Sequence, residues 1–183
     1  MKTKKESSEV FYIQGDITEF NKKLISDLIL KCKKSSQSKS RYCMHSNTKS
    51  KVQEMIICHK KNYYVRPHKH IDKKEESIFV IKGLAKAIFF DDGGKIKKII
   101  RLGDIGTKRP FYYKLNKNLF HTLLIESNFF VFHEVSKGPF KKNKTIFPRW
   151  APIKQDKIFK KFLNSQILKY EKNIQNKKKL PIV

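Results

Sequence analysis

The sequence predicts a mainly β protein, a sandwich or barrel with one amphipathic helix before it and another after it. Short runs of apolar and aromatic residues recur at nearly even spacing over about 95 residues, from Arg41 to Val135. The tetrapeptide Asp-Asp-Gly-Gly at 91–94 separates two of these runs, and it favours a hairpin turn because Asp and Gly tolerate positive φ. On both sides of this region the apolar spacing is helical instead.

The N-terminal part is predicted as an arm over residues 1–15, with a short strand at Val10–Ile13, followed by a helix. Apolar residues between Phe20 and Cys32 recur every three or four positions, which is the pattern of a helix with one buried face. Asp16 or Thr18 is the expected N-cap. The polar run at 33–40 ends the helix, whose apolar face we expect on the outside of the barrel.

The central part is predicted as short strands. They are expected at Arg41–His45, Val52–His59, Tyr63–Pro67, Ser77–Ile81, Leu84–Phe90, Ile96–Leu102, Phe111–Leu115, Phe120–Glu126 and Phe129–Val135. An irregular stretch follows Gly138-Pro139, and apolar spacing from Ile158 to Ile174 then predicts the second helix, as core cover, dimer contact or membrane-surface attachment. We expect one structural domain, with the arm and helix in 1–40, the barrel in 41–137 and the last segment in 138–183.

The net charge of +26 comes from 42 basic and 16 acidic residues. Nucleic-acid binding, an anionic membrane surface, an anionic substrate and simple lysine enrichment all compete to explain it. Five of the basic residues are arginine, and the charge is spread along the chain, which argues against a dedicated nucleic-acid interface. The remaining explanations of the charge are lysine enrichment and the recruitment of an anionic substrate.

The cysteines and the ends of the sequence indicate a cytoplasmic protein. Three cysteines without CxxC spacing predict neither a disulfide framework nor a zinc finger. The first residues lack the apolar region of a secretory signal, and no run approaches the roughly 18 apolar residues of a membrane span.

Two histidines at strand spacing are the strongest chemical signal. His68 and His70 are two residues apart, so in a strand both side chains point to the same side. Glu75 or Glu76 follows, and His121 opens a later predicted strand. Three imidazoles and one carboxylate suit Fe, Mn, Ni, Cu or Zn better than Ca or Mg.

The spacing of these residues resembles the first cupin motif, namely His-x-His, a gap, Glu76, six residues and Gly83. The second cupin motif resembles 116–121, where Asn replaces both its Pro and its Gly, and Asn118 is expected to hold a left-handed turn before His121. This resemblance favours Glu76 over Glu75. It implies one divalent transition metal (Fe, Mn, Zn or Ni) on His68, His70, Glu76 and His121.

Further segments resemble the WbuC family of cupin-fold metalloproteins over roughly 17–152. They are Arg41–His45, Val52–Met55, Tyr64–His70, Phe89–Gly93, His121–Leu124, Phe132–Glu134, Gly138–Phe140 and Trp150–Pro152. The resemblance implies a cupin (jelly-roll) β-barrel with a metal site. Genes of this family often lie among those for O-antigen or other surface-polysaccharide synthesis.

Several residues outside the predicted metal site are candidates for catalysis or substrate binding. His45 is a candidate proton carrier at the cavity mouth or else a structural histidine, and Tyr64 is a second candidate catalytic group. Arg41 and Arg66 are candidate contacts to an anionic substrate. His59 is expected at the surface, and His133 is expected behind the metal ligands or in the core. Trp150 is expected to pack against other side chains.

Three functional hypotheses follow. The first is a metal-dependent isomerase or epimerase acting on a sugar or nucleotide-sugar in surface-polysaccharide synthesis. The second is an Fe(II) dioxygenase-type cupin acting on a small organic substrate, and the third is a non-catalytic cupin that binds a sugar or anion. All three involve a small-molecule ligand, no specific nucleic acid and a possible homodimer.

Overall fold

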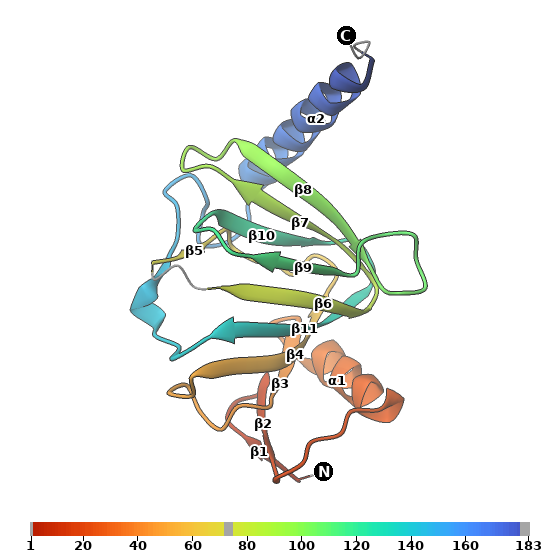
Figure 1. Cartoon of the computed structure of the whole chain (residues 1–183), viewed down its shortest axis with the longest axis vertical. Helices are drawn as coiled ribbons and strands as arrows, with labels where there is room; N and C mark the ends of the chain where they lie inside the picture. The colour runs from red at the N-terminus through yellow and green to blue at the C-terminus, as the bar shows by residue number, and fades with distance from the viewer. Residues whose placement is uncertain (1, 72–74, 180–183) are drawn as a thin grey trace.

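Two β-sheets face each other between two helices in the computed structural model, which describes residues 2–71 and 75–179 (Figure 1). The larger sheet has the strand order β1-β2-β3-β4-β11-β6-β9 and the smaller one has the order β10-β7-β8, while β5 and β12 form a third, two-stranded sheet. The strands of the large sheet are β1 (Lys2–Lys5), β2 (Val10–Gln14), β3 (Lys39–Cys43), β4 (Val52–Lys60), β11 (Phe129–Lys137), β6 (Glu76–Lys82) and β9 (Tyr112–Leu115). The others are β10 (Phe120–Ile125), β7 (Leu84–Phe90), β8 (Ile96–Gly103), β5 (Lys69–His70) and β12 (Thr145–Ile146).

The sheets form an open jelly-roll sandwich. The predicted jelly roll is therefore supported, but its sheets do not close into a barrel. All strand pairs are antiparallel except β2 with β3. The large sheet has seven strands and the small one has three, so the large sheet extends well past its partner on the side of β1, β2 and β3. No ladder joins β9 to β8 within the described residues, and ladder pairing between edge strands is what closes a barrel.

The space between the sheets is filled by side chains that alternate along each strand. Ile78 and Val80 of β6 point inward and are at most 2% exposed, and they pack with Phe89, Leu123 and Phe132. Phe79 and Ile81 lie on the opposite face of β6, as the alternation predicts.

Helix α1 (Lys22–Lys34) covers the outer face of the large sheet. Leu28 and Cys32 are fully buried against residues such as Tyr42 and Val131. The N-cap is Asn21, whose side-chain oxygen accepts a hydrogen bond from the amide of Leu24 at 3.1 Å. The predicted caps at 16 or 18 are therefore wrong, because the chain stays irregular until Asn21 satisfies the first free amides.

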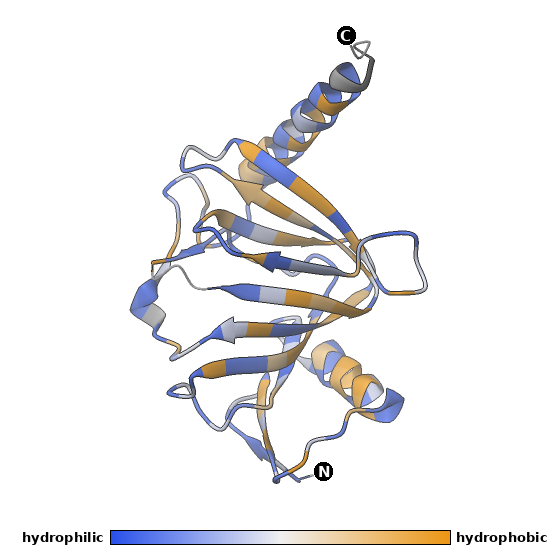
Figure 2. Cartoon of the chain, viewed as in Figure 1, coloured by the Kyte–Doolittle hydropathy of each residue, from blue (hydrophilic) through white to orange (hydrophobic). Residues whose placement is uncertain are grey.

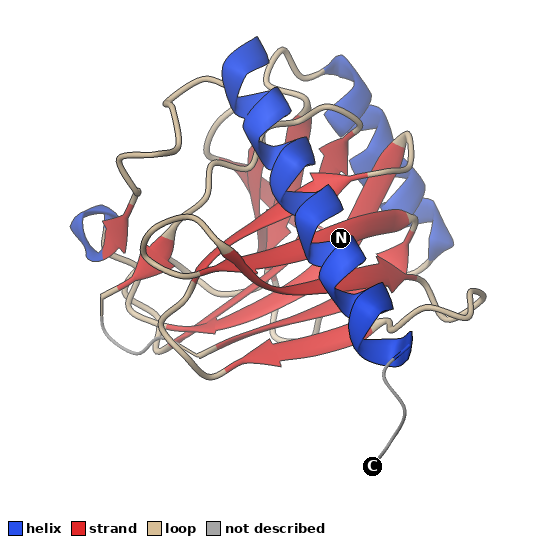
Figure 3. Ribbon diagram, turned by 90° about the horizontal axis from the view of Figure 1, so that it is seen from above, coloured by secondary structure: helices blue, strands red, loops and turns tan. Residues whose placement is uncertain are grey.

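Helix α2 (Lys157–Lys179) covers the outer face of the small sheet. Asp156 accepts a hydrogen bond from the amide of Phe159 at 2.7 Å and begins the helix, and the side chains of Phe159, Leu163 and Ile167 are buried. Seen from above, α2 runs across the front of the strands, whereas α1 lies at their edge, farther from the viewer (Figure 3). Hydropathy follows this packing, since α2 is hydrophobic near its start and mostly hydrophilic where it projects from the body (Figure 2). No described helix has the length and apolar character that a membrane crossing requires.

Two turns place the strands that carry the site. Gly83 joins β6 to β7 at φ +94°, and a Cβ there would lie 2.4 Å from the carbonyl oxygen of Phe129, so only glycine fits. The predicted hairpin at 91–94 is confirmed between β7 and β8, with Gly94 at φ +85°.

Three local predictions differ from the structure. Residues 2–14 form a hairpin of β1 and β2 that joins the large sheet, rather than a loose arm. Residues 63–67 are not a strand; the backbone oxygen of Val65 instead accepts a hydrogen bond from the hydroxyl of Thr122. Asn118 does not have a positive φ, and the turn is made by a hydrogen bond from the amide of Leu119 to the oxygen of Lys117 at 2.9 Å.

Candidate metal centre

Backbone pairing brings three histidines together. The amide of His68 donates to the oxygen of His121 at 3.1 Å, and the amide of His121 donates to the oxygen of His68 at 2.9 Å. His70 follows in β5 and points to the same side as His68, with 5.3 Å between the ring centroids. One ring nitrogen from each of His68, His70 and His121 lies within 4.8 Å of the others. This group can hold a metal ion.

Backbone carbonyls fix the tautomers of two of the rings. Nδ1 of His68 lies 2.9 Å from the oxygen of Arg66, and Nδ1 of His121 lies 3.0 Å from the oxygen of Leu119. A carbonyl oxygen only accepts, so Nδ1 carries the hydrogen in both rings. In the neutral rings the lone pair is therefore on Nε2, which is the orientation that metal-binding histidines normally have.

The structure places Glu76, and not Glu75, beside these histidines. One oxygen of Glu76 lies 3.1 Å from Nε2 of His121 and the other lies 3.4 Å from Nε2 of His70. Glu75 points to the outer side of the chain, where it forms an ion pair of 2.7 Å with Lys114. The start of β6 between them decides this, because successive residues of a strand face opposite ways.

Burial and mutual charge set the protonation of the group. Burial lowers the pKa of His68 to about 4, with a further contribution from the positive charge of His121. Burial alone would raise the pKa of Glu76, but the charge and hydrogen bond of His121 outweigh it and hold this pKa well below its usual range. Conversely, Glu76 raises the pKa of His121 against the effect of burial. The buried carboxylate thus stays ionised and favours a cation among the three imidazoles.

These donors fit a divalent transition metal. Three imidazole nitrogens with one buried carboxylate oxygen match Fe, Mn, Zn or Ni, whereas Ca and Mg prefer sets made only of oxygen. The four side chains lie on the wall of a cavity of about 780 Å³, which leaves a metal accessible to a small molecule.

All four of the other predicted site residues, Arg41, His45, Tyr64 and Arg66, also line this cavity. Nδ1 of His45 lies 3.0 Å from the backbone oxygen of Glu54, and its ring meets Tyr12 edge-on at 5.6 Å. Arg41 lies on the inner side of β3, on the part of the large sheet that the small sheet does not cover.

Two of these residues also hold the segment at 147–152 against the sandwich. The hydroxyl of Tyr64 donates to the oxygen of Pro152 at 3.0 Å, and burial raises the pKa of Tyr64 to about 12. The guanidinium of Arg66 donates twice to the oxygen of Ala151, at 3.1 and 2.9 Å, and lies 4.5 Å from the ring centre of Phe147. Both side chains are therefore engaged by the protein itself.

Two histidines lie elsewhere than predicted. His59 is 9% exposed in the cavity wall, not at the surface, because β4 continues through it and alternation points it inward with Ile57. His133 is on the outer face of β11, where Nε2 lies 2.9 Å from a carboxylate oxygen of Glu54, so it is neither core nor behind the ligands. Alternation along β4 from the inward Ile57 places His59 inward, and alternation along β11 from the inward Phe132 places His133 outward. Trp150 packs as predicted, with its ring centroid 5.0 Å from that of Phe90.

Comparison with known proteins supports the fold. Residues 20–102, less than half of the chain, match a family described as a domain of unknown function, DUF6016. No curated protein matches the sequence. Protein SO0799 from Shewanella oneidensis has a similar structure, with a TM-score of 0.52 and 9% identity over 68% of this chain and 84% of that one.

Two further solved structures are similar over shorter parts. CapF, in complex with the inhibitor 3-isopropenyl-tropolone, gives a TM-score of 0.50 and 17% identity over 62% of this chain and 32% of CapF. Oxalate decarboxylase from Bacillus subtilis gives 0.43 and 21% identity over 53% of this chain and 24% of that protein. The jelly-roll sandwich, its structural neighbours and the three-histidine group together show a cupin fold with a site suited to a metal.

Proposed function

We propose that this chain is a metal-dependent cupin in which His68, His70, Glu76 and His121 hold one divalent transition metal beside the large cavity. The convergence of the three histidines with the buried, ionised carboxylate carries this proposal. Burying these groups together costs free energy that a bound cation offsets. The metal would polarise a carbonyl or hydroxyl oxygen of the substrate.

The proposed substrate is a sugar or nucleotide-sugar of surface-polysaccharide synthesis. The supports are the resemblance of the sequence to the WbuC family and the presence of Arg41 and Arg66 in the wall of the cavity. Arg41 and His45 reach this cavity from β3 and the loop after it, and we assign them to substrate binding and to proton transfer. Tyr64 already donates to Pro152, so we assign it to holding that segment during the reaction.

Metal content is the test. Elemental mass spectrometry on the untagged protein should find about one transition metal per chain, and a His68→Ala/His70→Ala variant should lose it. His133→Ala, which removes a histidine from the outer face, should keep it. A native protein that takes up no metal even on reconstitution would refute the proposal. Binding of UDP-glucose to the loaded protein, followed by saturation-transfer NMR, then tests the substrate class.

A further inference from the structure

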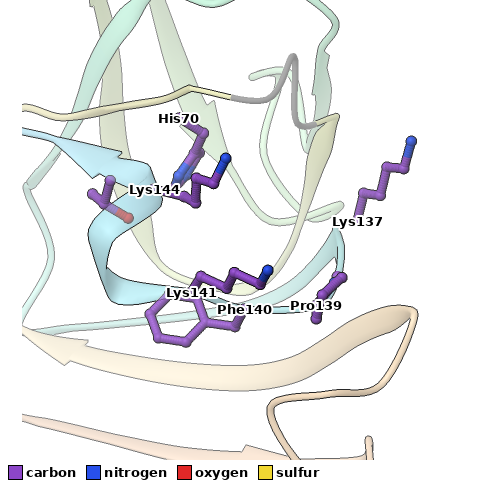
Figure 4. A pocket seen from close by; sticks show the side chains of 8 residues that line it. His70, Lys137, Pro139, Phe140, Lys141 and Lys144 are labelled. Carbon is purple, nitrogen blue, oxygen red and sulfur yellow. The ribbon is translucent and has the colours of Figure 1, made fainter.

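A second, smaller cavity of about 280 Å³ adjoins the candidate metal centre. It is lined by His70, Lys137, Gly138, Pro139, Phe140, Lys141, Lys144 and Thr145. His70, Phe140 and Thr145 also line the large cavity, so the two spaces meet at a proposed metal ligand. Figure 4 shows Lys141 and Lys144 reaching into the space between His70 and Phe140, with Lys137 at its far side.

Local structure fixes where these lysines lie. The amide of Lys144 donates to the oxygen of Lys141 at 3.0 Å in a turn that leads into the 3₁₀ helix η1 (Lys142–Lys144). Residues three apart in a 3₁₀ turn eclipse each other, so these two side chains leave the backbone on the same side. Strand pairing then sets Thr145 directly opposite His70, and the amide of Ile71 donates to the oxygen of Lys144 at 3.0 Å.

The other wall of this cavity is braced against the loop before β4. The amide of Gly138 donates to the oxygen of Lys51 at 2.7 Å, and the amide of Phe140 donates to the oxygen of Thr48 at 2.8 Å. A Cβ at Gly138 would lie 1.9 Å from the oxygen of Ser50, so this approach requires glycine. The cavity therefore has fixed walls on both sides.

Charge and size identify the ligand group. Three lysines, Lys137, Lys141 and Lys144, are among the described residues that line the cavity, and their positive charges favour an anionic ligand. Lysine ammonium groups serve as point-charge ligands for phosphate. The volume is just below the roughly 300–1,000 Å³ of whole-ligand pockets, which suits one ionic group whose remainder extends into the large cavity.

We propose that this cavity binds a phosphoryl group of the substrate on Lys141 and Lys144, while the rest of the molecule reaches the metal past His70. The inference deepens the proposed function, on which it rests for the identity of the neighbouring site. It narrows the substrate to a phosphorylated small molecule, such as a sugar phosphate or a nucleoside diphosphate derivative. It also gives part of the basic charge a specific role.

The test is calorimetric titration of inorganic phosphate and of pyrophosphate into the purified protein, with and without metal. A Lys141→Gln/Lys144→Gln variant should bind about tenfold more weakly or worse. A Lys97→Gln/Lys98→Gln variant is the matched control, since it removes the same charge from exposed positions on β8 and should bind as the wild type does.

The outcomes separate the two proposals. Equal binding by the wild type and the Lys141/Lys144 variant, or equal weakening in the control, would overturn the phosphoryl site and leave only a general charge effect. Metal content measured on the same samples should be unchanged by both lysine variants. If the protein binds no metal and phosphate affinity still depends on Lys141 and Lys144, the site stands and the metal-dependent function fails.

Discussion

The stability of this protein should depend on pH through His59. Burial, together with the nearby charges of Lys39 and Arg41, lowers the pKa of His59 to about 3. The ring lies between Tyr63 and Phe132, with centroid distances of 4.3 and 5.3 Å, and its buried Nδ1 has no hydrogen-bond partner among the residues that the structure describes. The unfolded chain therefore takes up a proton below about pH 6.5, where the folded chain does not.

The magnitude follows from this difference. Because the folded pKa is lowered, this contribution to stability is fully present above the unfolded value near 6.5 and is lost as the pH falls toward the folded value. At pH 5, about 1.5 units below the unfolded pKa, the loss from His59 alone is about 2 kcal/mol relative to pH 8. A His59→Phe variant has no such group and keeps an aromatic ring beside Tyr63 and Phe132.

Urea unfolding at pH 8 and pH 5 measures the effect, followed by the fluorescence of Trp150, the single tryptophan of the chain. Other groups titrate over the same range, so the comparison is between the two proteins. The wild type should lose about 2 kcal/mol more than His59→Phe between these pH values. Equal losses in both, within about 0.5 kcal/mol, would show that His59 is not held neutral by the fold.

Further predictions concern elements that position the sandwich, each measured by urea unfolding at pH 8. Leu28→Ala should cost about 2–5 kcal/mol because Leu28 is fully buried under α1, whereas Leu30→Ala, 48% exposed on the same helix, should cost under about 0.5. Gly83→Ala should destabilise the protein by more than about 1 kcal/mol, since its Cβ would collide with the oxygen of Phe129. Gly93→Ala should be nearly neutral, because its Cβ would contact only a side-chain oxygen, at 3.6 Å. Asn21→Ala should cost about 1 kcal/mol through loss of the helix cap. A cost below about 0.3 kcal/mol would contradict that capping role.

Much of the site follows from local spacing. His68 and His70 share a face because they are two residues apart, and alternation along β6 links Glu76 to the inward Ile78 and Val80. The six-residue gap to Gly83, as in the first cupin motif, favours Glu76 over Glu75, and the structure begins β6 at Glu76. The structure also explains why position 83 is glycine, because the β6–β7 turn has no room for a side chain.

Long-range pairing decided what spacing could not. The lysines that follow His59, Lys60 and Lys61, favour a surface position for it, but pairing with Phe130 continues β4 through His59. Lys141 and Lys144 belong to no recognisable sequence motif, so the sequence does not predict a site there. The pairing of β12 with β5 brings them beside His70. Which residue caps α1 likewise depends on the path of the chain after the first hairpin, and the structure places the cap at Asn21.

By itself the sequence determined the class of fold, the two amphipathic helices, the hairpin at 91–94 and the set of metal-binding candidates. These features depend on residues close together in the chain, whose periodicity and backbone preferences act locally. The tertiary structure alone decided that the sandwich is open, that His121 lies against His68, and that two cavities meet at His70. Those outcomes depend on which strands pair across the whole chain, and hydrophobic patterning fixes the buried face of a strand without fixing its partner.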